Sequence, residues 1–116
     1  MLMFTLGRIL FGAYFLFSGI NHFKDEKMLI GYAKSKGVPS SRVAVLLTGA
    51  MLMVGGLGIM ANINVGESAM LIVLFLIPTT FMMHNFWKTH DPAHKASDKA
   101  AFIRNLAFIG ALLMMI

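Results

Sequence analysis

The sequence predicts an all-α membrane protein: an antiparallel bundle of four transmembrane helices, with a short interfacial helix between the first two spans. Composition is the first observation, because 58% of the 116 residues are hydrophobic, only 13% are charged, and the mean hydropathy is +0.76. Such a chain has too little polar surface to cover a soluble globule of this size. The second observation is that long uncharged runs alternate with short polar connections. We expect a single domain, residues 1–116, with spans at about 3–22, 43–63, 68–87 and 98–116.

The first span, residues 3–22, has no charge between Arg8 and His22 and would be about 30 Å long as a helix, the thickness of a hydrocarbon core. Arg8, Gly12, Gly19 and His22 recur at helical spacing and therefore share one face. Glycines let another backbone come close, and an arginine avoids lipid. We therefore expect this face to point into the bundle.

Residues 23–42 form a basic connector in which apolar residues lie on one side of a short helical pattern and lysines on the others. This pattern predicts a helix that lies in the membrane interface. Gly37 is a plausible end for it, and Pro39 prevents its continuation. The next run, residues 43–63, carries no charge and is long enough to be the second span.

Glu67 precedes the third span, residues 68–87, where a carboxylate suits the N-terminus of a helix. We expect a polar loop from Thr89 to Lys99 after this span. The fourth span is the weakest prediction, because it is long enough only if it begins near Asp98 and includes Arg104 in its first turns.

The distribution of basic residues predicts the orientation of the chain in a cell inner (cytoplasmic) membrane. The loops 23–42 and 88–99 are rich in lysine and the remaining loop has no Lys or Arg, so the two basic loops should be cytoplasmic and both termini should lie outside. The formal charge of +5 does not indicate nucleic-acid binding, since the basic residues form no continuous stripe. The expected partner is the lipid bilayer with its anionic headgroups.

Polar residues from three predicted helices converge at the cytoplasmic end. Such a cluster could bind the polar head of an amphiphile whose tail lies between helices, and a histidine exchanges protons near neutral pH. The same residue types also cap helices or bond across a bundle, so a purely structural role stays open. The candidate ligand-binding residues are Asn21, His22, His84, Asn85, Trp87, Arg104 and Asn105.

Two residues at the opposite end of the bundle form a candidate structural ion pair. Arg8 lies near the outer end of the first span and Glu67 begins the third on the same side, so these opposite charges are placed to meet. The alternative is that the Arg8 side chain extends to the outer headgroups.

The chain has no identifiable metal site. It has no cysteine, which excludes disulfides and thiolate ligands. His90 and His94 are four residues apart, but Pro92 lies between them and breaks the helical spacing. His22 and His84 could in principle hold a haem from two sides, yet both lie near span ends and nothing implies a further ligand. No cofactor motif is present, quinone is left open, and no catalytic residue can be named.

Short motifs in a fixed order carry a family resemblance. They are Gly7-Arg8 with Phe17-Ser18-Gly19-Ile20-Asn21-His22-Phe23, then Gly37-Val38-Pro39, Gly55-Gly56-Leu57, His84-Asn85-Phe86-Trp87 with Asp91-Pro92, and Arg104-Asn105-Leu106-Ala107 with Gly110. In this order they resemble the DoxX family of small four-helix membrane proteins, over nearly all of the chain. One position departs from the resemblance, because many members carry a glutamate where this chain has Leu52.

The resemblance implies redox-linked work in the membrane. The family takes its name from a subunit of an archaeal complex that couples thiosulfate or quinol oxidation to respiration, and other members look like anchors that recruit partner oxidoreductases. The leading hypothesis is thus a subunit of a respiratory or redox complex, one that binds quinone or a lipid headgroup at the cytoplasmic end. We do not expect catalysis by this chain alone; at most it would be a subunit of a quinone-linked oxidoreductase.

The alternative function is that of a non-catalytic scaffold or accessory subunit, in which the same polar residues only hold helices together and stabilise a larger membrane assembly. Redox partner subunits and a homo-oligomer are both left open by the sequence. A small solute or lipid carrier is disfavoured, because Pro78 is the only helix break whereas transporters have paired broken helices or inverted repeats.

Overall fold

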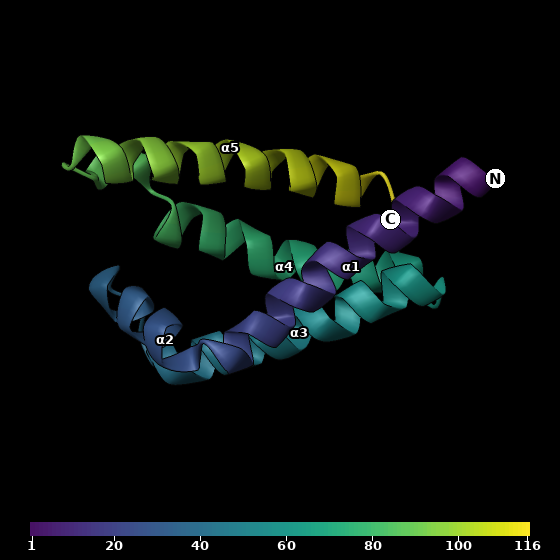
Figure 1. Cartoon of the computed structure of the whole chain (residues 1–116), viewed down its shortest axis with the longest axis horizontal. Helices are drawn as coiled ribbons and strands as arrows, with labels where there is room; N and C mark the ends of the chain where they lie inside the picture. The colour runs from purple at the N-terminus through teal and green to yellow at the C-terminus, as the bar shows by residue number, and fades with distance from the viewer.

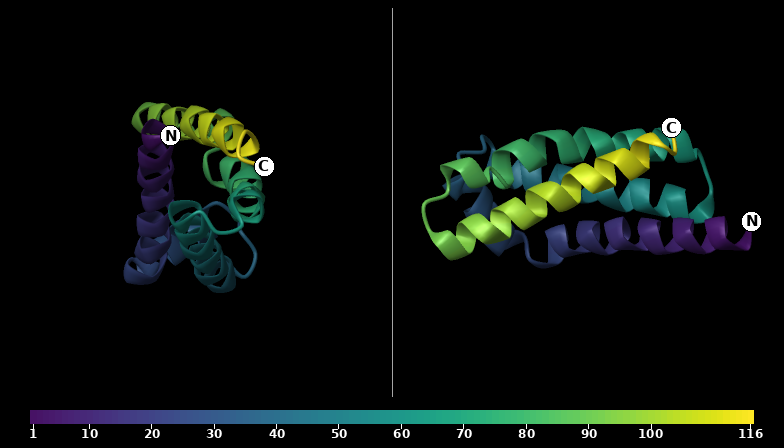
Figure 2. Two further views of the ribbon diagram at one scale, coloured as in Figure 1. Left: turned by 90° about the vertical axis from the view of Figure 1, so that its right-hand side faces the viewer. Right: turned by 90° about the horizontal axis from the view of Figure 1, so that it is seen from above.

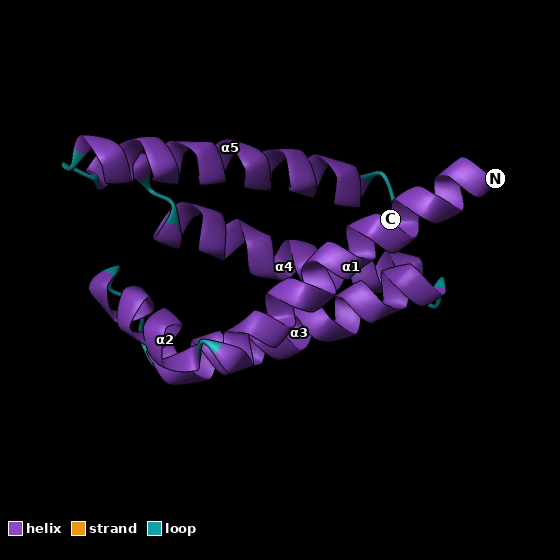
Figure 3. Ribbon diagram, viewed as in Figure 1, coloured by secondary structure: helices purple, strands orange, loops and turns teal.

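A computed structural model describes all residues, 1–116, and shows an all-α protein with five α-helices (Figure 3). The helices are α1 (Leu2–Lys24), α2 (Glu26–Ser35), α3 (Ser41–Ala61), α4 (Val65–Met83) and α5 (Pro92–Leu113), with a 3-10 turn, η1 (Phe86–Lys88), between the last two. The predicted short helix between the first two spans is confirmed as α2.

Three helical stretches are long and apolar enough to cross a membrane: α1, α3, and the stretch Val65–Lys88 that contains α4 and η1. They correspond to the first three predicted spans, and the chain is a multi-pass membrane protein. α5 is not among these stretches, because Lys95, Asp98, Lys99 and Arg104 interrupt its apolar character.

The start of α5 differs from the prediction. We expected a polar loop from Thr89 to Lys99, but the helix begins at Pro92. Proline suits the first helical position, since its missing N–H would have no partner there. Asp91 caps the helix, and its carboxylate accepts a hydrogen bond from the Ala93 N–H at 3.0 Å. Most of the predicted loop, residues 92–99, is therefore helix, and α5 ends at Leu113, before the predicted boundary at residue 116.

α1 and α3 pack so closely that their backbones touch at glycines. A Cβ atom added to Gly56 would lie 2.7 Å from the Gly12 carbonyl oxygen, and one added to Gly19 would lie 2.6 Å from the Gly49 carbonyl oxygen. No side chain fits in these gaps. Arg8, Gly12 and Gly19 are all buried, which confirms that this face of the first span points into the bundle.

α1 packs against α3, α3 against α4, and α4 against α5. Because α3 and α4 lie close beside the turn that joins them and separate away from it, we describe α1 with α3 and α4 with α5 as two helix pairs (Figure 1). The two termini and this turn lie at one end of the molecule, and α2 and η1 lie at the other, which we call the α2 end. Seen from above, α5 runs obliquely across the other long helices (Figure 2). Members of the core cluster come from all four long helices: Phe15, Leu52, Ile59, Ile72, Leu76 and Leu112.

An aromatic cluster joins α5 to α1 in the middle of the bundle. The Phe108 ring meets the rings of Phe11 and Phe15 edge-on, with centroids 5.7 and 5.5 Å apart. Beyond this cluster the two helix pairs diverge toward the α2 end, as Figure 1 shows.

Candidate functional site

A cavity of about 490 Å³ lies between the helix pairs at the α2 end, and residues of all five helices line it. A volume of this size is typical of small-molecule sites. Most of its lining residues are apolar, and they include Phe15, Leu52 and Phe75. The polar lining residues are Ser18, His22, Tyr32, Thr48, Thr79, His84, Arg104 and Asn105.

The structure brings four of the seven candidate residues to this cavity, namely His22, His84, Arg104 and Asn105. They come from α1, the end of α4 and α5, so the convergence is a property of the fold. The other three do not line it. Asn21 is exposed, Asn85 accepts a hydrogen bond from Lys36, and Trp87 packs among Phe81, Phe86 and Phe102.

His22 has one nitrogen engaged and one free. Its Nδ1 lies 2.7 Å from the Ser18 carbonyl oxygen, one turn back on α1. A carbonyl oxygen only accepts, so Nδ1 must carry a proton, and in the neutral ring Nε2 is then an acceptor. The free Nε2 has no partner in the chain and can accept a hydrogen bond from a molecule in the cavity.

Asn105 and Arg104 supply donors beside it. Asn105 is only 4% exposed, yet its side-chain amide has no hydrogen-bond partner within the chain. Its amide atoms keep some contact with the cavity and are not fully enclosed by protein, so a ligand or a water there can form hydrogen bonds with them. Arg104 is exposed at the cavity edge and forms no ion pair with Asp98 or any other carboxylate.

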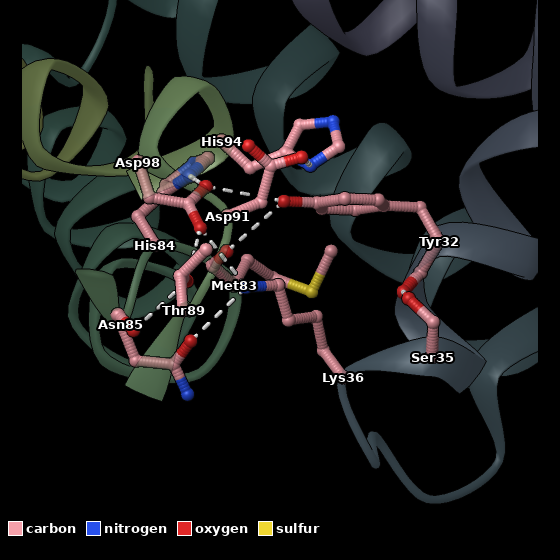
Figure 4. Close-up of polar contacts among 10 residues, drawn as sticks. All are labelled: Tyr32, Ser35, Lys36, Met83, His84, Asn85, Thr89, Asp91, His94 and Asp98. Carbon is pink, nitrogen blue, oxygen red and sulfur yellow. Dashed lines mark hydrogen bonds and ion pairs between the residues drawn. The ribbon is translucent and has the colours of Figure 1, made fainter. Parts of the chain in front are cut away.

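A group of hydrogen-bonded residues lies beside the cavity wall at Tyr32 and His84 (Figure 4), and of its members only Asn85 is predicted as a site residue from the sequence. Its centre is Asp98 of α5, which is 6% exposed. The Asp98 carboxylate accepts hydrogen bonds from Thr89 Oγ1 at 2.9 Å, Lys36 Nζ at 3.1 Å and the Tyr32 hydroxyl at 3.3 Å. Lys36 also donates to Asn85 Oδ1 at 3.1 Å. We call Tyr32, Lys36, Asn85, Thr89 and Asp98 the Asp98 cluster.

The Asp98 cluster also borders His84. The His84 Nδ1 atom lies 3.8 Å from Asp98 Oδ1, which is close for an ion pair and too long for a hydrogen bond. This nitrogen is buried and has no hydrogen-bond partner. A small movement of the His84 ring would therefore bring it into contact with Asp98.

The pKa values of two members of the Asp98 cluster, Tyr32 and Asp98, differ from their ordinary values. Burial, together with the negative charge and hydrogen bond of Asp98, raises the pKa of Tyr32. Burial alone would raise the pKa of Asp98 as well, but the hydrogen bonds from Thr89 and Lys36 and the charge of Lys36 outweigh it, so the pKa of Asp98 is lowered. Asp98 is therefore an anion at neutral pH and pairs with the Lys36 cation at 3.1 Å.

The sequence contains a pattern that indicates the burial of Asp98. A helix that begins at Pro92 with Asp91 as its cap places Asp98, Asn105 and Leu112 at intervals of two turns, on one face, and these are the residues of α5 that the structure buries. A loop up to Lys99 has no helical periodicity, so the predicted loop hides the helix face that Asp98 shares with Asn105 and Leu112.

The predicted pair of Arg8 and Glu67 is not formed. The structure has no ion pair between them, and Glu67 is exposed. Arg8 is 9% exposed, and its Nε and Nη1 atoms are buried without a hydrogen-bond partner. Its side chain thus stays inside the bundle, which also differs from the expected alternative of a side chain that reaches the headgroups.

His94, one of the two histidines of the predicted polar loop, lies outside the cavity. His94 lies in α5 and forms an exposed contact with Asp91 at 3.2 Å, and no cluster of three or more metal-ligating side chains occurs in the chain.

Leu52 is fully buried and lines the cavity. The position at which the resemblance described above implies a glutamate in many members is therefore part of the cavity wall.

Comparison with known proteins found one match. Neither the curated proteins nor the solved structures contain a match to this chain. The family model described as DoxX matches residues 3–85, which include α1 to α4 and exclude η1 and α5. This stretch is well over half of the chain, though shorter than the nearly complete likeness that the motifs suggest. The chain belongs to the DoxX family.

Proposed function

We propose that this protein is a membrane subunit of a redox complex and that it binds a quinone in the cavity at its α2 end. The observation that carries the proposal is the cavity itself, in which apolar walls meet polar groups that have no partner within the chain. These groups are the His22 Nε2 atom, the Asn105 amide and the Arg104 guanidinium.

A quinone has the chemistry that such a cavity would accept. Its ring and the first part of its tail are apolar and would contact Phe15, Leu52 and Phe75. Its carbonyl oxygens accept hydrogen bonds, which Asn105 and Arg104 can donate. In the reduced form its hydroxyl groups donate, and the His22 Nε2 atom can accept. Membership of the DoxX family supports a redox setting, because of the respiratory subunit from which the family is named.

The orientation in the membrane is part of the proposal. The α2 end carries the two basic loops, 23–42 and 88–99, so it would face the cytoplasm, with both termini outside an inner membrane. α5 would complete the four-helix bundle. Its first two turns, residues 92–99, would then lie at headgroup level, and its apolar remainder would lie along α4 in the hydrocarbon.

The test is quinone content after purification. The protein is purified in a mild detergent, its bound lipids are extracted, and quinone is measured from the absorbance change on chemical reduction. We expect quinone in the native protein, and a loss of about tenfold in His22→Ala or Asn105→Leu, the effect of removing roughly 1.4 kcal/mol of binding free energy. The control is His94→Ala, which changes an exposed histidine outside the cavity and should keep the native quinone content.

Other outcomes distinguish the alternatives. A preparation that contains phospholipid in place of quinone, with the same losses in the two variants, would assign the site to a lipid headgroup. A particle without either ligand that still captures respiratory subunits would contradict the proposal and favour the scaffold function.

A further inference from the structure

We infer that α2 is a lid over the cavity and that the Asp98 cluster is the latch that holds it closed. The inference rests on the proposed function only in taking the ligand to be an amphiphile. This ligand would have to enter the cavity that α2 borders at one end. The lid itself is argued from the packing of α2, from its polar contacts and from its connections to the rest of the chain.

α2 lies at the end of the bundle where the two helix pairs diverge (Figure 1), and it contributes to the lining of the cavity there. One face of the helix supplies Leu29, Tyr32 and Ala33 to the cavity lining. Lys27 and Lys34 lie on the other side and are exposed. Moving α2 away would therefore open the cavity at the α2 end of the bundle, beside the basic loops.

Apolar packing holds α2 only weakly. It packs against α3 and touches α1, but Ala33 is its only buried residue. A helix that buries so little apolar surface gains little from the hydrophobic effect, so its closed position depends on other contacts.

Polar side chains supply these contacts between α2 and the opposite helix pair, as Figure 4 shows. Lys36, just after α2, reaches Asp98 of α5 at 3.1 Å and Asn85 at 3.1 Å. The Tyr32 hydroxyl lies 3.3 Å from both Asp98 Oδ1 and the Met83 carbonyl oxygen. Two residues of the lid are thus tied to the opposite helix pair through one buried carboxylate, and Thr89 holds that carboxylate in place.

The connections on either side of α2 allow it to move as a unit. Asp25 alone separates it from α1, and a short stretch with Gly37 at a φ of +78° separates it from α3. A positive φ is readily adopted by glycine, so this connection can change conformation at low cost. Opening would break the contacts of the Asp98 cluster while the pairing of α1 with α3 stays intact.

Cysteine accessibility tests the lid directly, because the native chain has no cysteine. Val45→Cys places a single thiol in the cavity wall at a position that is only 7% exposed, and its reaction with a charged, water-soluble maleimide reports how often the lid is open. We expect labelling to become about tenfold faster when Asp98→Asn or Lys36→Gln is added, the change expected from losing one charge-assisted hydrogen bond. Tyr32→Phe, which loses only the hydroxyl, should give a smaller increase.

Matched controls separate the latch from general effects of charge or folding. Lys34→Gln removes an exposed lysine from the same helix, and Asp91→Asn changes an acid of α5 outside the Asp98 cluster; both should leave the labelling rate unchanged. Ser35→Cys, on the exposed part of α2, should react rapidly in every background. Size-exclusion profiles identify any variant that fails to fold, and Lys36→Gln and Tyr32→Phe test the latch independently of Asp98.

The result that would overturn the lid is an equal labelling rate of Val45→Cys in latch and control variants. Rapid labelling with the latch intact would overturn it as well, because the cavity would then be open without movement of α2. Neither outcome depends on quinone. A protein that shows the expected labelling but contains no quinone would keep the lid and lose the proposed ligand.

Discussion

Asp98 makes a contribution to stability that should depend on pH. Its pKa in the folded protein lies below the ordinary value of 3.8 because Thr89 and Lys36 stabilise the anion more than burial penalises it. A group with a lowered folded pKa stabilises the protein fully above its unfolded pKa, and this stabilisation is lost as the pH falls through the folded pKa. Acid should therefore loosen the contact between α2 and α5.

The measurement is the Tm of the native protein and of Asp98→Asn in detergent between about pH 7 and pH 3. We expect the native protein to be more stable by about 1–3 kcal/mol at neutral pH, and the difference to shrink below about pH 4. Asp91→Asn, in which asparagine still caps α5, should follow the native curve. A Tm difference that stays constant across the whole range would show that Asp98 does not act through its charge.

At the scale of the helix, the contact between α1 and α3 depends on glycine. Gly56→Ala would place a Cβ atom 2.7 Å from the Gly12 carbonyl oxygen and 2.7 Å from the Leu16 nitrogen, both of which belong to backbone that cannot move aside freely. We expect a loss of about 1–3 kcal/mol in stability from this overpacking, measured as a lower Tm.

Gly110→Ala is the matched control, because nothing lies within 4 Å of the added Cβ atom. This helix position should gain up to about 1 kcal/mol from the higher helix propensity of alanine. Equal Tm values for the two alanine variants would contradict the close approach of α1 and α3.

Features that depend on local periodicity could be predicted from the sequence. Uncharged runs predict the first three spans, and helical spacing predicts the inward face with Arg8 and Gly12. The structure confirms both predictions. The predicted start of α5 is wrong because the polar residues between Thr89 and Lys99 favour a loop, whereas Pro92 fits the first position of a helix that Asp91 caps.

The Asp98 cluster could not be predicted, because it depends on tertiary proximity. Lys36 and Asp98 are 62 residues apart, and the fold of α2 over the divergent helix pairs brings them together. The convergence of His22, His84 and Arg104 was easier to predict, since alternating spans bring those helix ends to the same side. The absence of a pair between Arg8 and Glu67 shows the limit of that reasoning, because a shared depth does not make two side chains meet.

For the whole molecule, the orientation in the membrane can be tested with two single cysteines. Asn64→Cys lies in the turn between α3 and α4, and Ser35→Cys lies at the end of α2, at opposite ends of the bundle. In intact cells, an impermeant maleimide should label Asn64→Cys directly and Ser35→Cys only after permeabilisation. Labelling of Ser35→Cys from outside would reverse the proposed orientation.

The most direct test of the account is photo-crosslinking of the purified protein with an azido-quinone, followed by mass spectrometry of its peptides. We predict that the label attaches to cavity residues on several helices, such as Phe15, Thr79 and Phe108, that excess unlabelled quinone prevents this, and that Asn105→Leu weakens it. Label found only on outward-facing residues such as Leu10 or Val54, or label that unlabelled quinone does not displace, would contradict a quinone site in the cavity.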